Sequence, residues 1–158
     1  MNIALTFHRI IDTDKQITAY EDLSLEKFNL ILNKINSSCH SLDYINNSKS
    51  KDISWLLTFD DGFCSDYEFV LPLLKKYKIN AIFFITTAYV GKPNYLTWEQ
   101  IRYLSDNGMV IGSHSVSHPD MISISKPERI IEFDTSRSII EDKISKIVTM
   151  FSFPYGRF

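Results

Sequence analysis

The amino-acid sequence predicts an α/β domain whose strands form a largely parallel sheet. Short apolar runs rich in β-branched and aromatic residues alternate with amphipathic segments, and this alternation is typical of consecutive β–α units. Polar residues directly follow several of the expected strands, at the sheet edge where parallel α/β folds build their functional sites. The hydrophobic periodicity alone fits either a twisted open sheet or an incomplete (β/α) barrel.

The composition fits one soluble domain spanning residues 1–158. The hydrophobic content of 44% is enough for a core, and 23% of the residues are charged. Seventeen Lys and Arg against nineteen Asp and Glu give a formal net charge of -2, without a basic run. We therefore expect no nucleic-acid partner. Two cysteines are too few for a disulfide framework.

No segment of the sequence predicts insertion into a membrane. The longest apolar stretch, residues 79–90, is interrupted by polar residues and is shorter than the roughly 20 residues that a transmembrane helix needs. The first residues lack a basic region ahead of an apolar one, so no secretory signal is predicted. As written, the chain is expected to be cytoplasmic, or extracytoplasmic if a leader has been removed. The sequence makes no prediction of the oligomeric state.

The alternation assigns six strands and four helices. The strands are expected at residues 3–7, 42–45, 55–59, 81–86, 110–112 and 147–153. The first helix begins at Ser24 and the second covers residues 66–77. Along the first helix, apolar residues recur at spacings of three and four, which predicts a buried face of Phe28, Ile31, Leu32 and Ile35.

Two capping boxes mark the other helices, because a Ser or Thr is followed three residues later by Glu or Gln. Thr97 and Gln100 open the third helix, which is expected to end at Gly108. Ser125 and Glu128 open the fourth, which runs to about residue 145. The apolar residues that these two helices are expected to bury are Trp98, Ile101 and Leu104 in the third and Phe133, Ile140 and Ile144 in the fourth.

Two adjacent carboxylates, Asp60 and Asp61, follow the expected strand at 55–59 and precede Gly62. A helix cap or a turn would explain Asp before Gly equally well. Two like charges at a buried strand end are nevertheless costly unless a cation compensates them. This pair therefore indicates a metal ion, although it is not specific by itself.

Two histidines, His114 and His118, lie four residues apart directly after another expected strand. That separation lets both imidazoles face one ion if the segment forms a helical turn. Two imidazoles and one carboxylate leave positions open, as in a catalytic zinc site, and the second carboxylate is then free to accept a proton during hydrolysis. A ferrous oxygenase with two His and one carboxylate is a further alternative, because His118 and Asp120 form an H-x-D pair. No histidine follows this pair, and the alternating βα pattern does not favour it.

Several segments together resemble the polysaccharide deacetylases with a NodB-type domain, also called carbohydrate esterase family 4. The segments are TFHRI at 6–10, TFDDG at 58–62, LPLL at 71–74, AIFFI at 81–85, IGSHSVSHP at 111–119 and FSFPYG at 151–156. The last of them is similar to the exopolysaccharide-deacetylase branch. The resemblance implies a distorted, incomplete (β/α) barrel and removal of acetyl groups from an N-acetylhexosamine in a poly- or oligosaccharide.

The resemblance also assigns roles to residues of this sequence. It makes Asp60 the catalytic base, and it implies one divalent ion, zinc in the first place, held by Asp61, His114 and His118. Pro154 and Tyr155 match the segment that contacts substrate, with the Tyr155 backbone N–H at the oxyanion. Independently of the resemblance, Tyr89, Tyr95 and Trp98 near the loop at residues 91–94 are candidates for a rim on which sugar rings stack, with core packing as the alternative.

The sequence departs from the family pattern in two respects. Ser152 stands where an Arg is expected to tune the base. The motifs that follow in the family, including the one with the general-acid histidine, are absent from the sequence, so a C-terminally truncated and weakly active domain is expected. His8 is then the candidate acid, and a role in packing or in orienting the site explains its position equally well. The alternative is a catalytically impaired remnant that binds a metal ion or a sugar.

Overall fold

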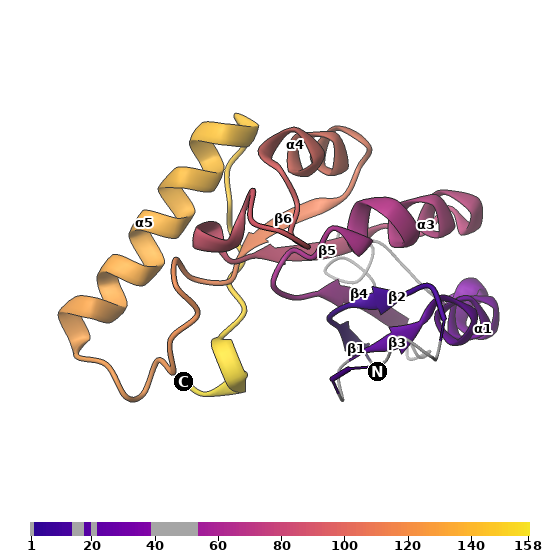
Figure 1. Ribbon diagram of the computed structural model, residues 1–158, viewed down its shortest axis with the longest axis horizontal. Coiled ribbons are helices and arrows are strands. Elements are labelled where there is room, and N and C mark those ends of the chain that lie inside the picture. Colours follow the sequence, from indigo (N-terminus) through magenta and orange to yellow (C-terminus); the bar gives the residue numbers. More distant parts are fainter. Residues whose placement is uncertain (1, 14–17, 20–21, 39–53) are drawn as a thin grey trace.

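The computed structural model describes residues 2–13, 18–19, 22–38 and 54–158. A four-stranded parallel sheet forms its centre (Figure 1), with the strands in the order β1-β4-β5-β6. These strands are β1 (Asn2–Phe7), β4 (Ser54–Phe59), β5 (Ala81–Ile85) and β6 (Val110–Ser113). A separate parallel pair joins β2 (Ile10–Ile11) to β3 (Leu23–Ser24).

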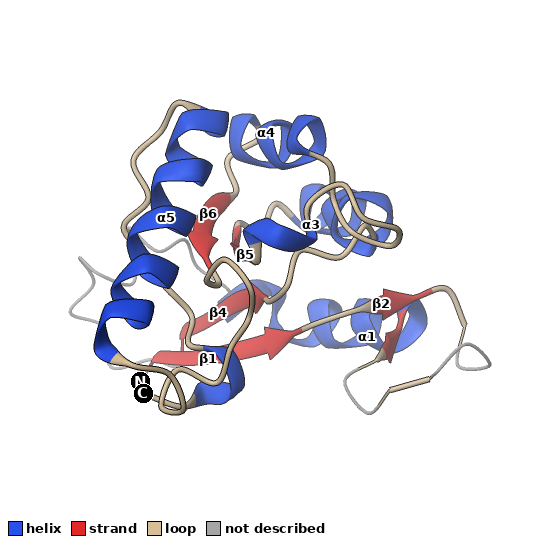
Figure 2. Cartoon of the chain, turned by 60° about the vertical axis from the view of Figure 1, so that its left-hand side comes forward, coloured by secondary structure: helices blue, strands red, loops and turns tan. Residues whose placement is uncertain are grey.

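The helices are arranged around the curved sheet (Figure 2). The α-helices are α1 (Leu25–Ile35), α3 (Leu71–Tyr77), α4 (Trp98–Asp106) and α5 (Lys126–Ile144). Shorter helical turns are η2 (Asn36–Ser38), η3 (Asp66–Val70), η4 (Thr87–Tyr89) and η5 (Pro154–Gly156). Within the described residues β1 and β6 stay at the two edges of the sheet, so the predicted incomplete (β/α) barrel is confirmed.

The apolar core lies between the sheet and its helices. The ring of Phe59 on β4 stacks on that of Phe83 on β5, with ring centroids 4.9 Å apart, and meets Phe28 of α1 edge-on at 5.8 Å. Side chains alternate between the two faces of a strand. Thr58 therefore points away from this core, where its hydroxyl donates to Oγ1 of Thr6 at 2.9 Å. Asp60 lies two residues after Thr58, so its side chain points to the same face of the sheet as Thr58, away from this core.

Most of the expected elements are confirmed, and both capping boxes form with their reciprocal hydrogen bonds. The buried face of α1 contains Phe28, Leu32 and Ile35. The expected strand at 42–45 lies outside the described residues. Three expected core residues, Ile31, Trp98 and Phe133, are only half-buried, and Phe133 packs against Phe151 with ring centroids 4.1 Å apart.

The predicted strand at residues 147–153 is wrong. Among the described residues this segment forms a single bridge, between Ser113 and Phe151, beside the end of β6. Further pairing is prevented at one end because the Val148 amide donates to the Glu141 side chain at 2.9 Å. At the other end Pro154 has no N–H and begins η5. The run of apolar residues therefore predicted a longer strand than this segment forms.

The second predicted helix, residues 66–77, is divided into a π-helical turn and an α-helix. The amide of Leu71 donates to the Asp66 carbonyl five residues earlier, which is the π-helical pattern. Pro72 lacks the N–H that would donate within an ordinary α-helix at this point.

No helix in the described part of the chain is long and apolar enough to cross a membrane.

Candidate functional site

Several of the residues singled out in the sequence lie around one cavity of about 680 Å³ at the carboxyl ends of the strands. This volume is in the range of ordinary small-molecule sites. Backbone pairing explains the convergence, since the Asp60 amide donates to the Phe7 carbonyl and the His114 amide to the Ile85 carbonyl, each at 2.9 Å. The site residues among those lining the cavity are His8, Asp60, Asp61, His114, His118, Ser152 and Tyr155.

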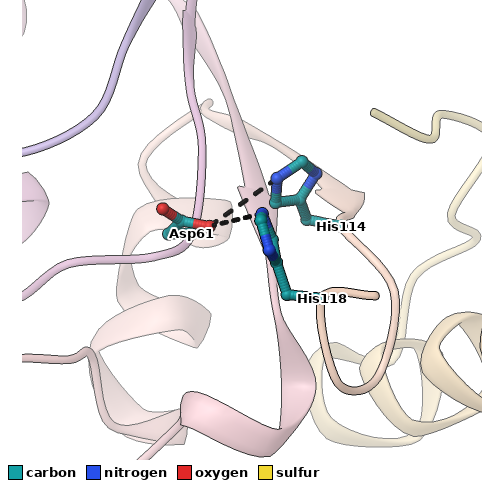
Figure 3. A group of neighbouring side chains, drawn as sticks. All are labelled: Asp61, His114 and His118. Atoms are coloured by element: carbon teal, nitrogen blue, oxygen red, sulfur yellow. Dashed lines mark ion pairs between the residues drawn. The ribbon is translucent and has the colours of Figure 1, made fainter. Parts of the chain in front are cut away.

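Three of these residues form a compact group of potential ligands (Figure 3). Asp61 Oδ1 lies 3.6 Å from Nε2 of His114 and 3.4 Å from Nε2 of His118. Two atoms bonded at about 2.1 Å to one tetrahedral ion lie about 3.4 Å apart. The three side chains therefore have the spacing and the chemistry of a site for one metal ion.

The state of the individual ligand atoms also fits a cation. Asp61 Oδ1 is buried and has no hydrogen-bond partner in the described part of the chain, and a buried carboxylate oxygen without a partner is costly unless a cation is bound. Nδ1 of His114 is 2.9 Å from the Ser152 carbonyl oxygen, which leaves Nε2 for the ion. Burial lowers the pKa of His114 to about 4, so its imidazole is neutral and able to ligate near pH 7.

The loop conformations that present these ligands are unusual for residues other than glycine. Asp61, Ser115 and His118 have positive φ angles of 75°, 70° and 61°. Such conformations cost roughly 1–2 kcal/mol each and persist only when surrounding contacts hold them. Contacts around residues 113–118 are therefore part of the construction of the site.

Asp60 lies beside the ligand group without belonging to it. Its side chain is nearly buried, and its Oδ2 accepts a hydrogen bond from the Ser152 hydroxyl at 3.1 Å and lies 3.9 Å from Nε2 of His114. Burial raises the pKa of Asp60, against the opposing influence of His8, the Ser152 hydrogen bond and His118. At the sequence position where the family resemblance implied an arginine, the Ser152 hydroxyl contacts Asp60 instead.

The other predicted site residues differ in how directly they face the cavity. His8 and Tyr155 line it, whereas Pro154 is buried and is absent from the described lining. The Tyr155 side chain is exposed, its φ is 59°, and its ring packs edge-on against His118 with centroids 4.8 Å apart. Tyr89 and Tyr95 lie 4.8 Å apart between ring centroids, and Tyr95 stacks on Phe63 of the cavity wall.

An ion pair in the cavity wall was missed by sequence reasoning. Arg9 forms a bidentate contact with Asp22, through Nε at 2.8 Å and Nη2 at 2.6 Å. The same carboxylate accepts from the Thr18 and Ala19 amides, at 2.8 Å and 3.0 Å. The hydrogen bond from Arg9 holds the pKa of Asp22 well below its ordinary value. Arg9 directly follows the expected His8, but no sequence spacing indicated Asp22 as its partner.

Asp66 is a second feature that the sequence did not indicate. It begins the π-helical turn η3, is fully buried, and neither carboxylate oxygen has a hydrogen-bond partner in the described residues. Burial, reinforced by the charges of Asp61 and Asp60, raises its pKa well above 3.8. The folded protein therefore favours the protonated form of this carboxyl group.

Replacing Asp66 by Asn is expected to change how the stability depends on pH. A raised folded-state pKa stabilises the native protein fully below pH 3.8, and this contribution is lost as the pH rises towards the folded-state pKa. Over that window the parent should lose about 1.4 kcal/mol per pH unit relative to the neutral Asp66→Asn variant. Urea unfolding of both proteins from pH 4 to pH 8 measures this difference, and parallel curves would contradict it.

Comparison with known proteins gives the geometry a family context. A sequence profile of the polysaccharide deacetylases matches residues 47–158. The peptidoglycan-N-acetylmuramic acid deacetylase PdaA of Bacillus subtilis is 33% identical over 117 residues, which cover 72% of this chain and 41% of PdaA. The chain spans about two fifths of the length of the first curated relatives that it matches.

Solved structures agree with this assignment at the level of the fold. The deacetylase PplD of Streptococcus pyogenes superposes with a TM-score of 0.86 at 24% identity, covering 98% of this chain and 74% of PplD. IcaB from Ammonifex degensii superposes with a TM-score of 0.82 at 22% identity, again covering 98% and 74%. Together with the profile match over most of the sequence, these findings show that the chain belongs to the polysaccharide deacetylase family.

Proposed function

We propose that this chain carries the metal-binding half of a hydrolase site that removes acetyl groups from an N-acetylhexosamine in a poly- or oligosaccharide. The observation that carries the proposal is the placement of Asp60 beside the group of Asp61, His114 and His118 in one cavity. A proton acceptor next to a three-ligand site with open positions suits metal-dependent hydrolysis. Membership of the polysaccharide deacetylase family supports the substrate class.

Asp61, His114 and His118 would hold one divalent ion, and zinc is the metal proposed. When bound, the ion supplies a Lewis acid that polarises the acetyl carbonyl and lowers the pKa of a nearby water molecule. The hydrogen bond from His114 Nδ1 to the Ser152 carbonyl oxygen keeps the ring oriented for ligation. The role of these side chains is thus to bind and orient.

Asp60 is proposed as the general base that accepts the proton of the attacking water. Burial raises the pKa of its carboxylate, which makes it a better proton acceptor than an exposed aspartate. The hydrogen bond from the Ser152 hydroxyl fixes the orientation of Oδ2. Oδ1 of Asp60 is buried as well and has no hydrogen-bond partner in the described residues.

Two further residues are assigned supporting roles in the same proposal. The Tyr155 backbone N–H would donate to the carbonyl oxygen as negative charge develops there, in the manner of an oxyanion hole, and Pro154 fixes the start of that turn. His8 lines the cavity and is the candidate donor of a proton to the departing amine. The aromatic surface of Phe63 and Tyr95 offers a face on which a sugar ring can stack.

Acetate release tests the proposed function with two substrates. N-acetylglucosamine oligomers report the complete reaction, whereas 4-nitrophenyl acetate has a leaving group that departs without protonation and isolates the attack step. We expect the zinc-loaded chain to hydrolyse both, the ester faster, and to lose both activities after chelation and regain them with zinc. The proposal would be contradicted if neither substrate were hydrolysed in a zinc-dependent manner.

A further inference from the structure

The loop that carries the two histidines is held from two sides. On one side, backbone groups after β5 bind the loop carbonyls: the Thr87 amide donates to the Ser115 carbonyl at 3.2 Å, and the Ala88 amide to the Val116 carbonyl at 2.9 Å. These contacts use main-chain donors, so they depend little on the side chains of residues 87 and 88. The loop amides are bound on the other side by α5.

The contact from α5 is made by the carboxylate of Glu132. Its Oε2 accepts from the amides of Val116 at 2.7 Å and Ser117 at 3.0 Å, and its Oε1 accepts from the Ser117 hydroxyl at 2.7 Å. Successive amides that converge on one anion form a concave binding site for negative charge. Glu132 therefore fills this concavity from within the protein.

A second contact one helical turn later reinforces the first. Ser136 lies four residues after Glu132, on the same side of α5, and its hydroxyl is 2.6 Å from the Ser113 hydroxyl. Ser113 Oγ in turn accepts from the Ser115 amide at 3.2 Å, and Ser115 Oγ accepts from the His118 amide at 2.9 Å. Hydrogen bonds thus connect α5 with the backbone of the second histidine.

We propose that Glu132 is a positioning residue that fixes the loop between His114 and His118 in its metal-binding conformation. The inference rests on the proposed metal site. Ser115 and His118 both have positive φ angles, so the loop adopts this shape only while other contacts outweigh the backbone strain. Glu132 is not among the described residues that line the cavity, so it acts on the site through the loop.

Three substitutions separate geometry from charge. Glu132→Asp keeps the charge but withdraws the carboxylate by about 1.5 Å, the length of one carbon–carbon bond. Glu132→Gln keeps the length, its carbonyl oxygen can accept from both loop amides, and the Ser117 hydroxyl can accept from its amide group. Glu132→Ala removes the contact. Asp134→Ala, at an exposed carboxylate on the same helix, is the matched control.

Zinc affinity, measured by competition with a chromophoric chelator, is the first readout. Loss of a residue that supports a metal ligand typically weakens binding about 10- to 100-fold. We expect losses of that size in Glu132→Ala and Glu132→Asp, a change of at most a few-fold in Glu132→Gln, and none in Asp134→Ala. Unchanged affinity in both Glu132→Ala and Glu132→Asp would overturn the inference, as would an equal loss in Glu132→Gln, because charge and not position would then matter.

Amide hydrogen exchange of the metal-free protein is the second readout, since it needs no bound ion. Peptides covering residues 113–119 should exchange faster in Glu132→Ala and Glu132→Asp than in the parent, while Glu132→Gln and Asp134→Ala should match the parent. If the parent binds no zinc, the proposed function fails, and exchange alone decides on Glu132. Exchange in this segment that is the same in all five proteins would refute the positioning role.

Discussion

Replacing Asp61, His114 and His118 together by alanine is expected to abolish stoichiometric zinc binding. These side chains supply the group of ligand atoms in the described structure that lie within 4.8 Å of one another. The potential ligands left in the described cavity lining are Asp60, His8 and Asp22, which is paired with Arg9. They do not form a group of three ligand atoms close enough for one ion. We expect the parent to contain one zinc ion per chain after gel filtration and the triple variant to contain none, as measured by elemental analysis.

A control variant shows whether the loss is specific to the ligands. His8 lines the same cavity but is assigned no role in ligation, so His8→Ala should retain one zinc ion per chain. Circular dichroism of the metal-free proteins checks that the fold is kept. Zinc retained at full stoichiometry in the folded triple variant would refute the ligand assignment.

The sequence was informative wherever chemistry and local spacing coincide. Asp60 and Asp61 could be placed at a strand end because a buried apolar run precedes them directly, and the two histidines because their spacing is local. The capping boxes at Thr97 and Ser125 were predictable for the same reason, since each reciprocal pair lies within one helical turn. Local patterns therefore predicted the site's position and the helix starts.

Features that depend on distant partners were not predictable. Glu132 is one of several acidic residues on α5, and only the packing of this helix against the loop gives it three hydrogen bonds. Asp66 looked like an ordinary residue at a helix start, whereas the fold buries it completely. The two-residue strands β2 and β3 are too short to produce a periodic pattern. Burial and pairing over long separations decide such cases.

Replacing Asp60 by Asn is expected to preserve zinc binding and to remove nearly all hydrolysis. The amide keeps the size of the side chain, and its oxygen can still accept from the Ser152 hydroxyl, but it cannot take a proton from water near pH 7. Removing a general base typically lowers the rate about 100-fold or more. Zinc content and the hydrolysis of 4-nitrophenyl acetate are measured on the same samples.

The two measurements together distinguish base from ligand, which the distances alone separate only narrowly. Asp60 Oδ2 lies 3.9 Å from His114 Nε2, against 3.6 Å for Asp61 Oδ1. If Asp60 were a ligand, Asp60→Asn would lose zinc together with activity, whereas a base loses activity alone. Asp61→Asn should lose both, and Asp134→Asn, the same change at an exposed site, neither. Full activity in Asp60→Asn would exclude Asp60 from proton transfer and leave water or His8 as the acceptor.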